Sequence, residues 1–170
     1  ASVQVWPCGW FQRIENSLDA VHTSFVHQNS RFGEKLSTAV PELEFAETEW
    51  GIRMIAKRSP TNIRINEFHL PNCNHIVVPT QLPGQNRGKT LPWTDLFNWF
   101  VPVDDAHTAF FTTRSAPITG KPAAEFESWL ETATRYNPAD HNDELFSGKM
   151  PAEDVGDTAT ALVSAQDYVA

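Results

Sequence analysis

A run of short strand-like segments through the middle of the chain constrains the fold more than any other feature of the sequence. Apolar and polar residues alternate within the segments, and turn-forming residues separate them, which is typical of strands with one buried face. The clearest alternation runs through residues 97–103, whose odd-numbered members are all apolar. A change of parity between Ile65 and Phe68 predicts a β-bulge. Strands are expected at residues 3–6, 43–50, 51–57, 63–70, 74–79, 97–103 and 108–113.

Helical patterns lie on both sides of this run of strands. Residues 15–27 form the first, and Asn16 or Ser17 can cap its start. Residues 123–136 form the second, because apolar side chains recur there every three or four positions. Residues 158–170 form the third. Successive strands with helices at the two ends predict an α+β fold with an antiparallel sheet.

Length and charge exclude several classes of protein. A chain of 170 residues is expected to form one domain, residues 1–170. The formal net charge of −8 and the pI near 5.1 argue against binding nucleic acid or an anionic membrane, since both partners favour a basic face. The sequence shows neither a signal peptide nor a long apolar run. Cys8 and Cys73 are too few for a disulfide framework, so a cytoplasmic location is expected.

The densest chemical signal lies in residues 19–27, where Asp19, His22 and His27 occupy nine consecutive positions. On a regular helix, at about 100° per residue, Asp19 and His22 are about 60° apart, but His22 and His27 are about 140° apart. The two imidazoles can converge if the helix contains a π-type bulge, or if His27 lies beyond the end of the helix. The spacing alone is therefore modest evidence for a metal site.

The residue types around the histidines favour one kind of metal site. Asp19 can accept the non-ligating N–H of His22, as carboxylates beside metal-bound histidines do. With one further carboxylate, His22 and His27 would form a facial triad that leaves three positions open on a six-coordinate ferrous ion. A structural zinc site would instead use four protein ligands.

Three stretches of the sequence resemble a known family. Residues 6–16, which read WPCGWFQRIEN and run into Asp19, His22 and His27, resemble the catalytic-domain motif of Rieske non-haem iron oxygenases, closest to the phthalate and vanillate branch. Residues 98–105 (NWFVPVDD) resemble the central strand and turn of that family. Residues 164–170 (SAQDYVA) resemble the short motif that supplies its third iron ligand.

This resemblance implies a fold, a site and partners. The implied fold is the helix-grip type (Bet v 1/START-like), a curved antiparallel sheet around a long helix with a substrate cavity between them. By resemblance, His22, His27 and Asp167 would bind mononuclear Fe(II), and Asp19 would bridge His22 to a Rieske-cluster histidine of a neighbouring subunit. The implied assembly is a homo-oligomer, commonly a trimer, that uses O2, an aromatic substrate and a reductase or ferredoxin as electron donor.

The sequence departs from the family at the Rieske cluster. The cluster requires a C-x-H and a later C-x2-H. Cys73 and His75 match the first half, but no cysteine follows them, so both are interpreted as ordinary sheet residues. Three other histidines are interpreted as surface or sheet residues: His69, His107 and His141. The Rieske [2Fe-2S] cluster is therefore expected from a part of the subunit outside this sequence, and the chain is interpreted as a fragment of a longer oxygenase subunit.

The substrate can be predicted only as a class. Arg53 and Arg64 on expected strands would clamp a substrate carboxylate if they face the cavity, and would be ordinary surface charges if they face outward. Asn98 is a weaker candidate for orienting the substrate. The reaction stays open between dihydroxylation, monohydroxylation and O-demethylation. Two alternatives remain: a non-catalytic helix-grip module that binds a hydrophobic small molecule, and a hydrolytic zinc enzyme, for which no general base stands out.

Overall fold

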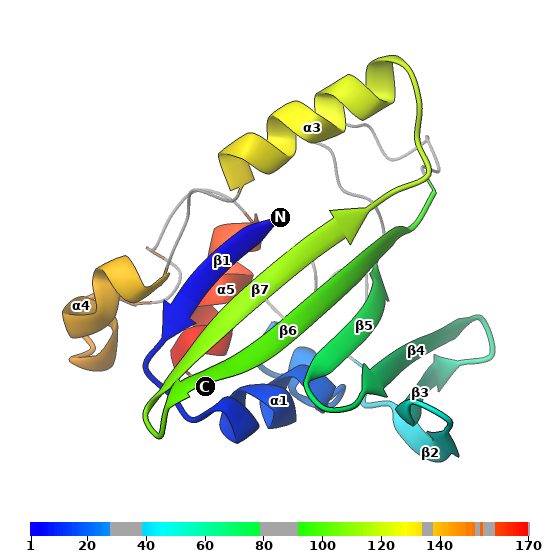
Figure 1. Ribbon diagram of the computed structural model, residues 1–170, viewed down its shortest axis with the longest axis horizontal. Coiled ribbons are helices and arrows are strands. Elements are labelled where there is room, and N and C mark those ends of the chain that lie inside the picture. Colours follow the sequence, from blue (N-terminus) through cyan, green and yellow to red (C-terminus); the bar gives the residue numbers. More distant parts are fainter. Residues whose placement is uncertain (28–38, 79–91, 134–137, 152–153, 155–158, 170) are drawn as a thin grey trace.

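The computed structural model describes residues 1–27, 39–78, 92–133, 138–151, 154 and 159–169. Within them, one antiparallel sheet of seven strands has the order β1-β7-β6-β5-β4-β3-β2 (Figure 1). The strands are β1 (Ser2–Trp6), β2 (Glu42–Thr48), β3 (Gly51–Ser59), β4 (Asn62–His69), β5 (Cys73–Val78), β6 (Thr94–Asp104) and β7 (His107–Ser115). The helices are α1 (Trp10–Leu18), η1 (His22–Ser24), α3 (Lys121–Ala133), η2 (Pro138–His141), α4 (Asn142–Phe146) and α5 (Ala159–Val169).

The sheet follows from the alternation in the sequence. From β2 to β7 each strand pairs with the next one along the chain, and β1 closes the order by pairing with β7. All the expected strands are present, and the α+β class with an antiparallel sheet is confirmed. The expected bulge between Ile65 and Phe68 is wrong, because the register shift lies between Lys57 and Ser59 of β3. In β4 Ile65 is exposed and Phe68 is buried, so the change of parity reflects apolar residues on both faces.

The two faces of the sheet differ in what covers them. In β6 the buried residues are Thr94, Asn98 and Phe100, and the apolar set at positions 97, 99, 101 and 103 lies on the other face. Residues of α1, η1, α3 and α5 line a cavity together with the face of Asn98, which we call the inner face. The opposite, outer face carries exposed Val3, Ile65 and Phe111. Residues of odd number in β3 to β6 lie on this outer face, because paired strands keep the same parity across the sheet.

The first helix differs from the expected one. It begins at Trp10, where the amide of Gly9 donates to Oε1 of Gln12 at 3.1 Å, and not at Asn16 or Ser17. It ends at Leu18, because Asp19 adopts an extended conformation with φ −80° and ψ 99°. The expected single helix over residues 15–27 is therefore wrong, and a turn and the short η1 replace its second half.

The other two helices agree better with the sequence. The α3 helix occupies the described part of the expected 123–136 segment, and residues 134–136 lie outside the described residues. The α5 helix matches the expected 158–170 segment to within one residue at each end among residues that the structure describes. None of the described helices has the length and hydropathy required to cross a membrane.

The core consists of small clusters around the cavity rather than one large one. Ile14 of α1 packs with Phe68 and Phe100 of the sheet. Trp6 of β1 meets Tyr168 of α5 edge to face, with ring centroids 5.0 Å apart. This contact joins the two ends of the described chain, and α5 lies behind β1 in Figure 1.

Candidate metal centre

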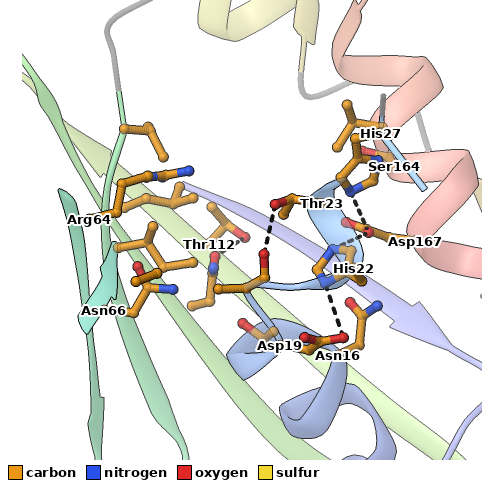
Figure 2. Close-up of a pocket in the computed structure, with 18 of the residues that line it drawn as sticks. Asn16, Asp19, His22, Thr23, His27, Arg64, Asn66, Thr112, Ser164 and Asp167 are labelled. Atoms are coloured by element: carbon orange, nitrogen blue, oxygen red, sulfur yellow. Dashed lines mark hydrogen bonds and ion pairs between the residues drawn. The ribbon is translucent and has the colours of Figure 1, made fainter. Parts of the chain in front are cut away.

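A cavity of about 260 Å³ lies between the inner face of the sheet and the helices. Its apolar walls come from both sides: Ile76, Val78, Leu96, Phe110, Phe126 and Val163. His22, His27 and Asp167 line one side of it, and Arg64 and Asn66 lie across the pocket on the sheet (Figure 2). The cavity is therefore large enough for a one-ring molecule, since an engineered apolar cavity of about 150 Å³ binds benzene.

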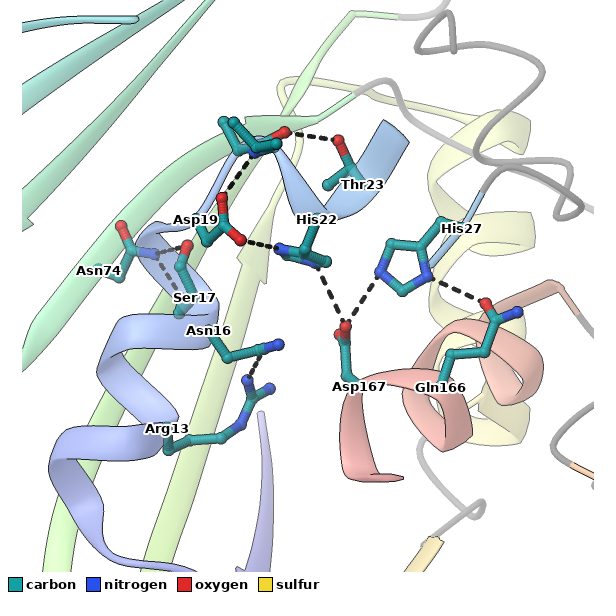
Figure 3. A network of polar contacts seen from close by, with 12 residues as sticks. Arg13, Asn16, Ser17, Asp19, His22, Thr23, His27, Asn74, Gln166 and Asp167 are labelled. Carbon is teal, nitrogen blue, oxygen red and sulfur yellow. Dashed lines mark hydrogen bonds and ion pairs between the residues drawn. The ribbon is translucent and has the colours of Figure 1, made fainter. Parts of the chain in front are cut away.

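The three expected metal ligands converge in the structure. Oδ1 of Asp167 lies 3.4 Å from Nε2 of His22 and 3.0 Å from Nε2 of His27 (Figure 3). One ligand atom from each of the three residues lies within 4.8 Å of the others. Two atoms bound at right angles to one ion, each about 2.1 Å from it, are about 3 Å apart. The three side chains are therefore close enough to one another to bind a single ion together.

Local backbone structure brings the histidines together. His22 begins η1, and His27 lies in the turn after it, beyond any regular helix. The imidazole rings are 5.1 Å apart, with an angle of 78° between their planes. Of the two routes to convergence that the spacing left open, the structure shows the one in which His27 lies past the end of the helix. Asp167 arrives from α5, at the opposite end of the sequence.

Gln166 holds the ring of His27. Oε1 of Gln166 lies 3.0 Å from Nδ1 of His27, and both side chains are buried, with His27 only 1% exposed. An amide oxygen accepts, so Nδ1 of His27 donates to Gln166, and Nε2 is the ring atom that faces Asp167. A metal bound through Nε2 would take the place of the Nε2 proton, while the contact of Nδ1 with Gln166 stays. Proteins commonly orient a metal-bound histidine by such a contact.

Asp19 lies beside His22, but its hydrogen bond is with the backbone. Its Oδ1 accepts the amide N–H of Val21 at 2.7 Å, which stabilises the turn after α1. Its Oδ2 is 3.9 Å from Nδ1 of His22, a distance for an ion pair rather than a hydrogen bond. Nδ1 of His22 is buried and has no hydrogen-bond partner within the part of the chain that the structure describes. The side chain of Asp19 is 47% exposed, so its carboxylate also faces solvent.

The surroundings keep Asp167 ionised. Burial by itself would raise the pKa of Asp167, but hydrogen bonds from His22 and His27 and the charge of Arg13 outweigh it and hold the pKa well below its usual range. Burial would likewise lower the pKa of His27, yet its hydrogen bond with Asp167 raises that pKa above the usual value. Without a metal, the site is thus a carboxylate held between two imidazoles.

Arg13 is a buried cation behind the site that the sequence analysis missed. Its guanidinium lies 4.2 Å from the ring centroid of Trp6 and 4.8 Å from that of Phe110, and it donates to Oδ1 of Asn16 at 2.5 Å. Burial lowers its pKa, while the charge of Asp167 raises it. Arg13 therefore balances one negative charge in an otherwise buried place. An arginine between aromatic residues in the WPCGWFQR stretch was the available signal.

The structure separates the two arginines that the sequence offered for substrate binding. Arg64 and Asn98 line the cavity. Arg53 does not, because its odd position in β3 places it on the outer face, where its Nε donates to Oε1 of Glu67 at 2.7 Å. Arg53 as a cavity residue is therefore wrong. The odd and even positions of Arg53 and Arg64 place them on opposite faces, but the sequence does not say which face lines the cavity.

Two further arginines complete the cavity. Arg58 and Arg114 line it together with Arg64. Arg114 pairs with Leu96 on the inner face, and Arg58 lies at the register shift of β3. The guanidinium of Arg58 donates to the carbonyl oxygen of Ala20 and to Oγ1 of Thr23, both at 2.8 Å. Burial, with the charge of Arg58 second, lowers the pKa of Arg64 to about 10, so Arg64 stays protonated at neutral pH. The three arginines therefore give the sheet side of the cavity a positive charge.

The fold and the site together define a class: an α+β domain with two histidines and one carboxylate at the wall of an apolar cavity. Non-haem iron oxygenases use this donor set and leave the remaining positions on the metal open. The donor set fits such an ion, because the three ligand atoms lie at coordination spacing and Asp167 is ionised. No protein-family model matches the chain.

Curated proteins with similar sequences are oxygenase subunits. One is the phthalate 4,5-dioxygenase oxygenase subunit of Pseudomonas putida, 26% identical over 122 residues that cover 62% of this chain and 26% of that protein. Another is the tert-butanol monooxygenase / tert-amyl alcohol desaturase oxygenase subunit of Aquincola tertiaricarbonis, 28% identical over 134 residues that cover 65% of this chain and 26% of that protein. The chain thus matches about a quarter of the length of these relatives.

Solved structures show the same fold. NdmB of Pseudomonas putida CBB5 superposes with a TM-score of 0.53 and 14% identity, over 99% of this chain and 47% of that one. NdmA of the same strain superposes with a TM-score of 0.51 and 19% identity, over 97% of this chain and 46% of that one. The resemblance to Rieske oxygenase subunits expected from the sequence, and the fold class that it implied, are confirmed.

Proposed function

We propose that this chain is the catalytic domain of an oxygenase component that inserts oxygen from O2 into an aromatic substrate. One observation carries the proposal: His22, His27 and Asp167 come from opposite ends of the chain and meet at the wall of a mainly apolar cavity. A module that only binds hydrophobic molecules has no reason to place a buried carboxylate between two imidazoles there. The similarity to oxygenase subunits supports the same conclusion.

His22, His27 and Asp167 would hold Fe(II). The bound ferrous ion supplies the activation of O2, which protein side chains cannot perform. Gln166 holds Nδ1 of His27, so that Nε2 faces the ion position. The apolar walls would contact a substrate ring bound next to the site, and that ring would displace water from this space.

A carboxylated aromatic ring fits the cavity best. The cavity has mainly apolar walls and carries Arg58, Arg64 and Arg114 on the sheet. An arginine matches a carboxylate with two parallel hydrogen bonds. The name of one relative, a phthalate dioxygenase, agrees with such a substrate. The class of oxidation stays open between dihydroxylation, monohydroxylation and O-demethylation.

Asp19 would connect the site to its electron donor. Its carboxylate lies beside His22 and is also exposed, so a neighbouring subunit can reach it. The donor would be a Rieske [2Fe-2S] cluster carried by a neighbouring subunit of a homo-oligomer, commonly a trimer. A reductase or ferredoxin would supply the cluster with electrons.

Asp19→Asn should keep the Val21 contact and the full iron content. It should slow reduction of the ferric site by a reduced Rieske protein about 100-fold; an unchanged rate would exclude this path.

Metal analysis tests the proposal directly. The chain is reconstituted anaerobically with ferrous iron, passed through a desalting column, and its iron measured per chain. We expect about one iron in the wild type, and at most a tenth of that in His22→Ala and Asp167→Ala, since both remove a ligand. His107→Ala is the control, because His107 pairs with Asp104 in an exposed turn away from the cavity. Full iron content in His22→Ala would contradict the ligand assignment, and a chain that binds aromatic acids without taking up iron would be a carrier.

A further inference from the structure

A second group of metal-ligating side chains lies on the outer face of the sheet. Glu67 and His69 belong to β4, and His75 belongs to the neighbouring β5. One ligand atom of each lies within 4.8 Å of those of the other two. The cavity and the proposed iron site use none of these residues.

The sheet itself brings these side chains together. Glu67 and His69 are two positions apart on one strand, so both point to the outer face, and Glu67 is paired directly with His75 across the β4–β5 ladder. Side chains directly opposite each other in an antiparallel pair have Cβ atoms about 4.5–5.5 Å apart. Two hydrogen-bonded strands therefore fix the three donors without a flexible loop.

The spacing suits a small divalent ion. Nε2 of His69 lies 3.5 Å from Oε2 of Glu67. Two donors bound tetrahedrally to one zinc ion, each about 2.0–2.1 Å from it, are about 3.3–3.4 Å apart. An ion thus needs only small movements of side chains that remain 21–35% exposed and accessible to solvent.

Neighbouring residues orient each donor. Arg53 holds Oε1 of Glu67, which leaves Oε2 toward His69, and the same hydrogen bond lowers the pKa of Glu67. The ring of His75 stacks on Phe97, with centroids 4.3 Å apart and 6° between the planes. Oδ1 of Asp95 lies 2.9 Å from Nε2 of His75 and brings a second carboxylate to the edge of the group. Such supporting contacts are typical of metal ligands.

We propose that Glu67, His69 and His75 form a second metal site that binds Zn2+ or a similar transition-metal ion on the outer face of the sheet. Two imidazoles and one carboxylate favour such an ion over Ca2+ or Mg2+, which prefer oxygen ligands only. The site is open, since three residues leave a position for water or for Asp95. Binding would tie β4 to β5 and stabilise the folded chain. It is independent of the proposed iron site, because the two lie on opposite faces of the sheet.

Zinc titration of the iron-loaded protein tests this site. The probe is ZnCl2, and the readouts are zinc bound per chain after dialysis, the affinity by calorimetry, and the shift of the melting temperature. We expect one zinc per chain in addition to the iron. His69→Ala and His75→Ala should each weaken zinc binding about 10-fold or more and abolish the melting shift, with iron content unchanged. Glu67→Gln should weaken it in the same direction.

The controls distinguish this site from the other histidines. His107→Ala removes an exposed histidine that also pairs with a carboxylate, Asp104, and should leave zinc binding unchanged. His22→Ala should lose iron and keep the zinc of the outer face. The proposal is overturned if His69→Ala and His75→Ala bind zinc as the wild type does, or if zinc binds only by replacing iron and is lost in His22→Ala. Circular dichroism confirms that each variant is folded.

Discussion

Asp167 carries the negative charge at the centre of the site. In the metal-free chain its carboxylate is held by two imidazoles and by the nearby charge of Arg13, and these contacts outweigh the cost of its burial. A bound cation would replace the imidazole contacts with coordination bonds and keep the same charge balance. The site is thus arranged for a cation before one arrives, and the same contacts make the stability of the metal-free chain depend on pH.

That dependence can be predicted from the directions of the two pKa shifts. The folded-state pKa of Asp167 is below its unfolded value, so its contribution is complete above about pH 4 and is lost as the pH falls through the folded pKa. The folded-state pKa of His27 is above its unfolded value, so its contribution is complete below about pH 6.5 and is lost as the pH rises through the folded pKa. The pair is therefore most stabilising between those limits.

Asp167→Asn should accordingly destabilise the metal-free chain most near pH 5.5. We expect a loss of about 1.5–3 kcal/mol there, the usual value of a hydrogen bond to a charged group, and a smaller loss at pH 8. Urea unfolding in the presence of a chelator measures both values. An equal loss at the two pH values would show that the His27–Asp167 contact does not stabilise the fold through its charge.

The strands and helices show which parts of this structure the sequence could predict. Strand alternation predicted the strands, because residues of the inner face such as Met54, Phe68 and Phe100 are buried while their neighbours along the strand are not. The first helix was misplaced, because the break at Asp19 depends on the hydrogen bond from the amide of Val21 to the Asp19 side chain, a contact that the residue type alone does not predict. His22 and His27 were found from their spacing, whereas Asp167 was found only by family resemblance. Gln166 and Arg114 give no sequence signal, since their roles depend on which side of an element faces the cavity.

The two faces of the sheet provide a matched pair of variants at this scale. Arg64 on β4 faces the cavity, and Arg53 on β3 faces outward toward Glu67. Arg64→Met should weaken binding of an aromatic carboxylate about 10–100-fold, because a charge-assisted hydrogen bond contributes about 1.5–3 kcal/mol. Binding of the corresponding neutral amide should change much less, and Arg53→Met should change neither. Calorimetry with benzoate-type acids and their amides measures both affinities; equal losses in the two arginine variants would rule out the carboxylate role of Arg64.

At the scale of the whole molecule, the site joins the two ends of the chain. His22 and His27 follow the first helix, and Asp167 lies in the last one. The hydrogen bond between His27 and Gln166 and the packing of Trp6 on Tyr168 join the same two ends. A metal bound by all three ligands would therefore link α5 to the N-terminal segment across the cavity. Because only the folded chain brings the ligands together, metal binding should stabilise the fold by about 2.7 kcal/mol at a free-metal concentration 100 times the Kd.

This coupling should be visible in α5 itself. Hydrogen exchange of the amides of residues 159–169 should slow when ferrous iron is added anaerobically, because opening of α5 would then require loss of a ligand. The amides of β3 and β4, whose hydrogen bonds run within the sheet, should change less. In His22→Ala the protection of α5 should disappear while the sheet stays as in the wild type. Protection of α5 that is the same with and without iron would mean that Asp167 does not coordinate the metal together with the histidines.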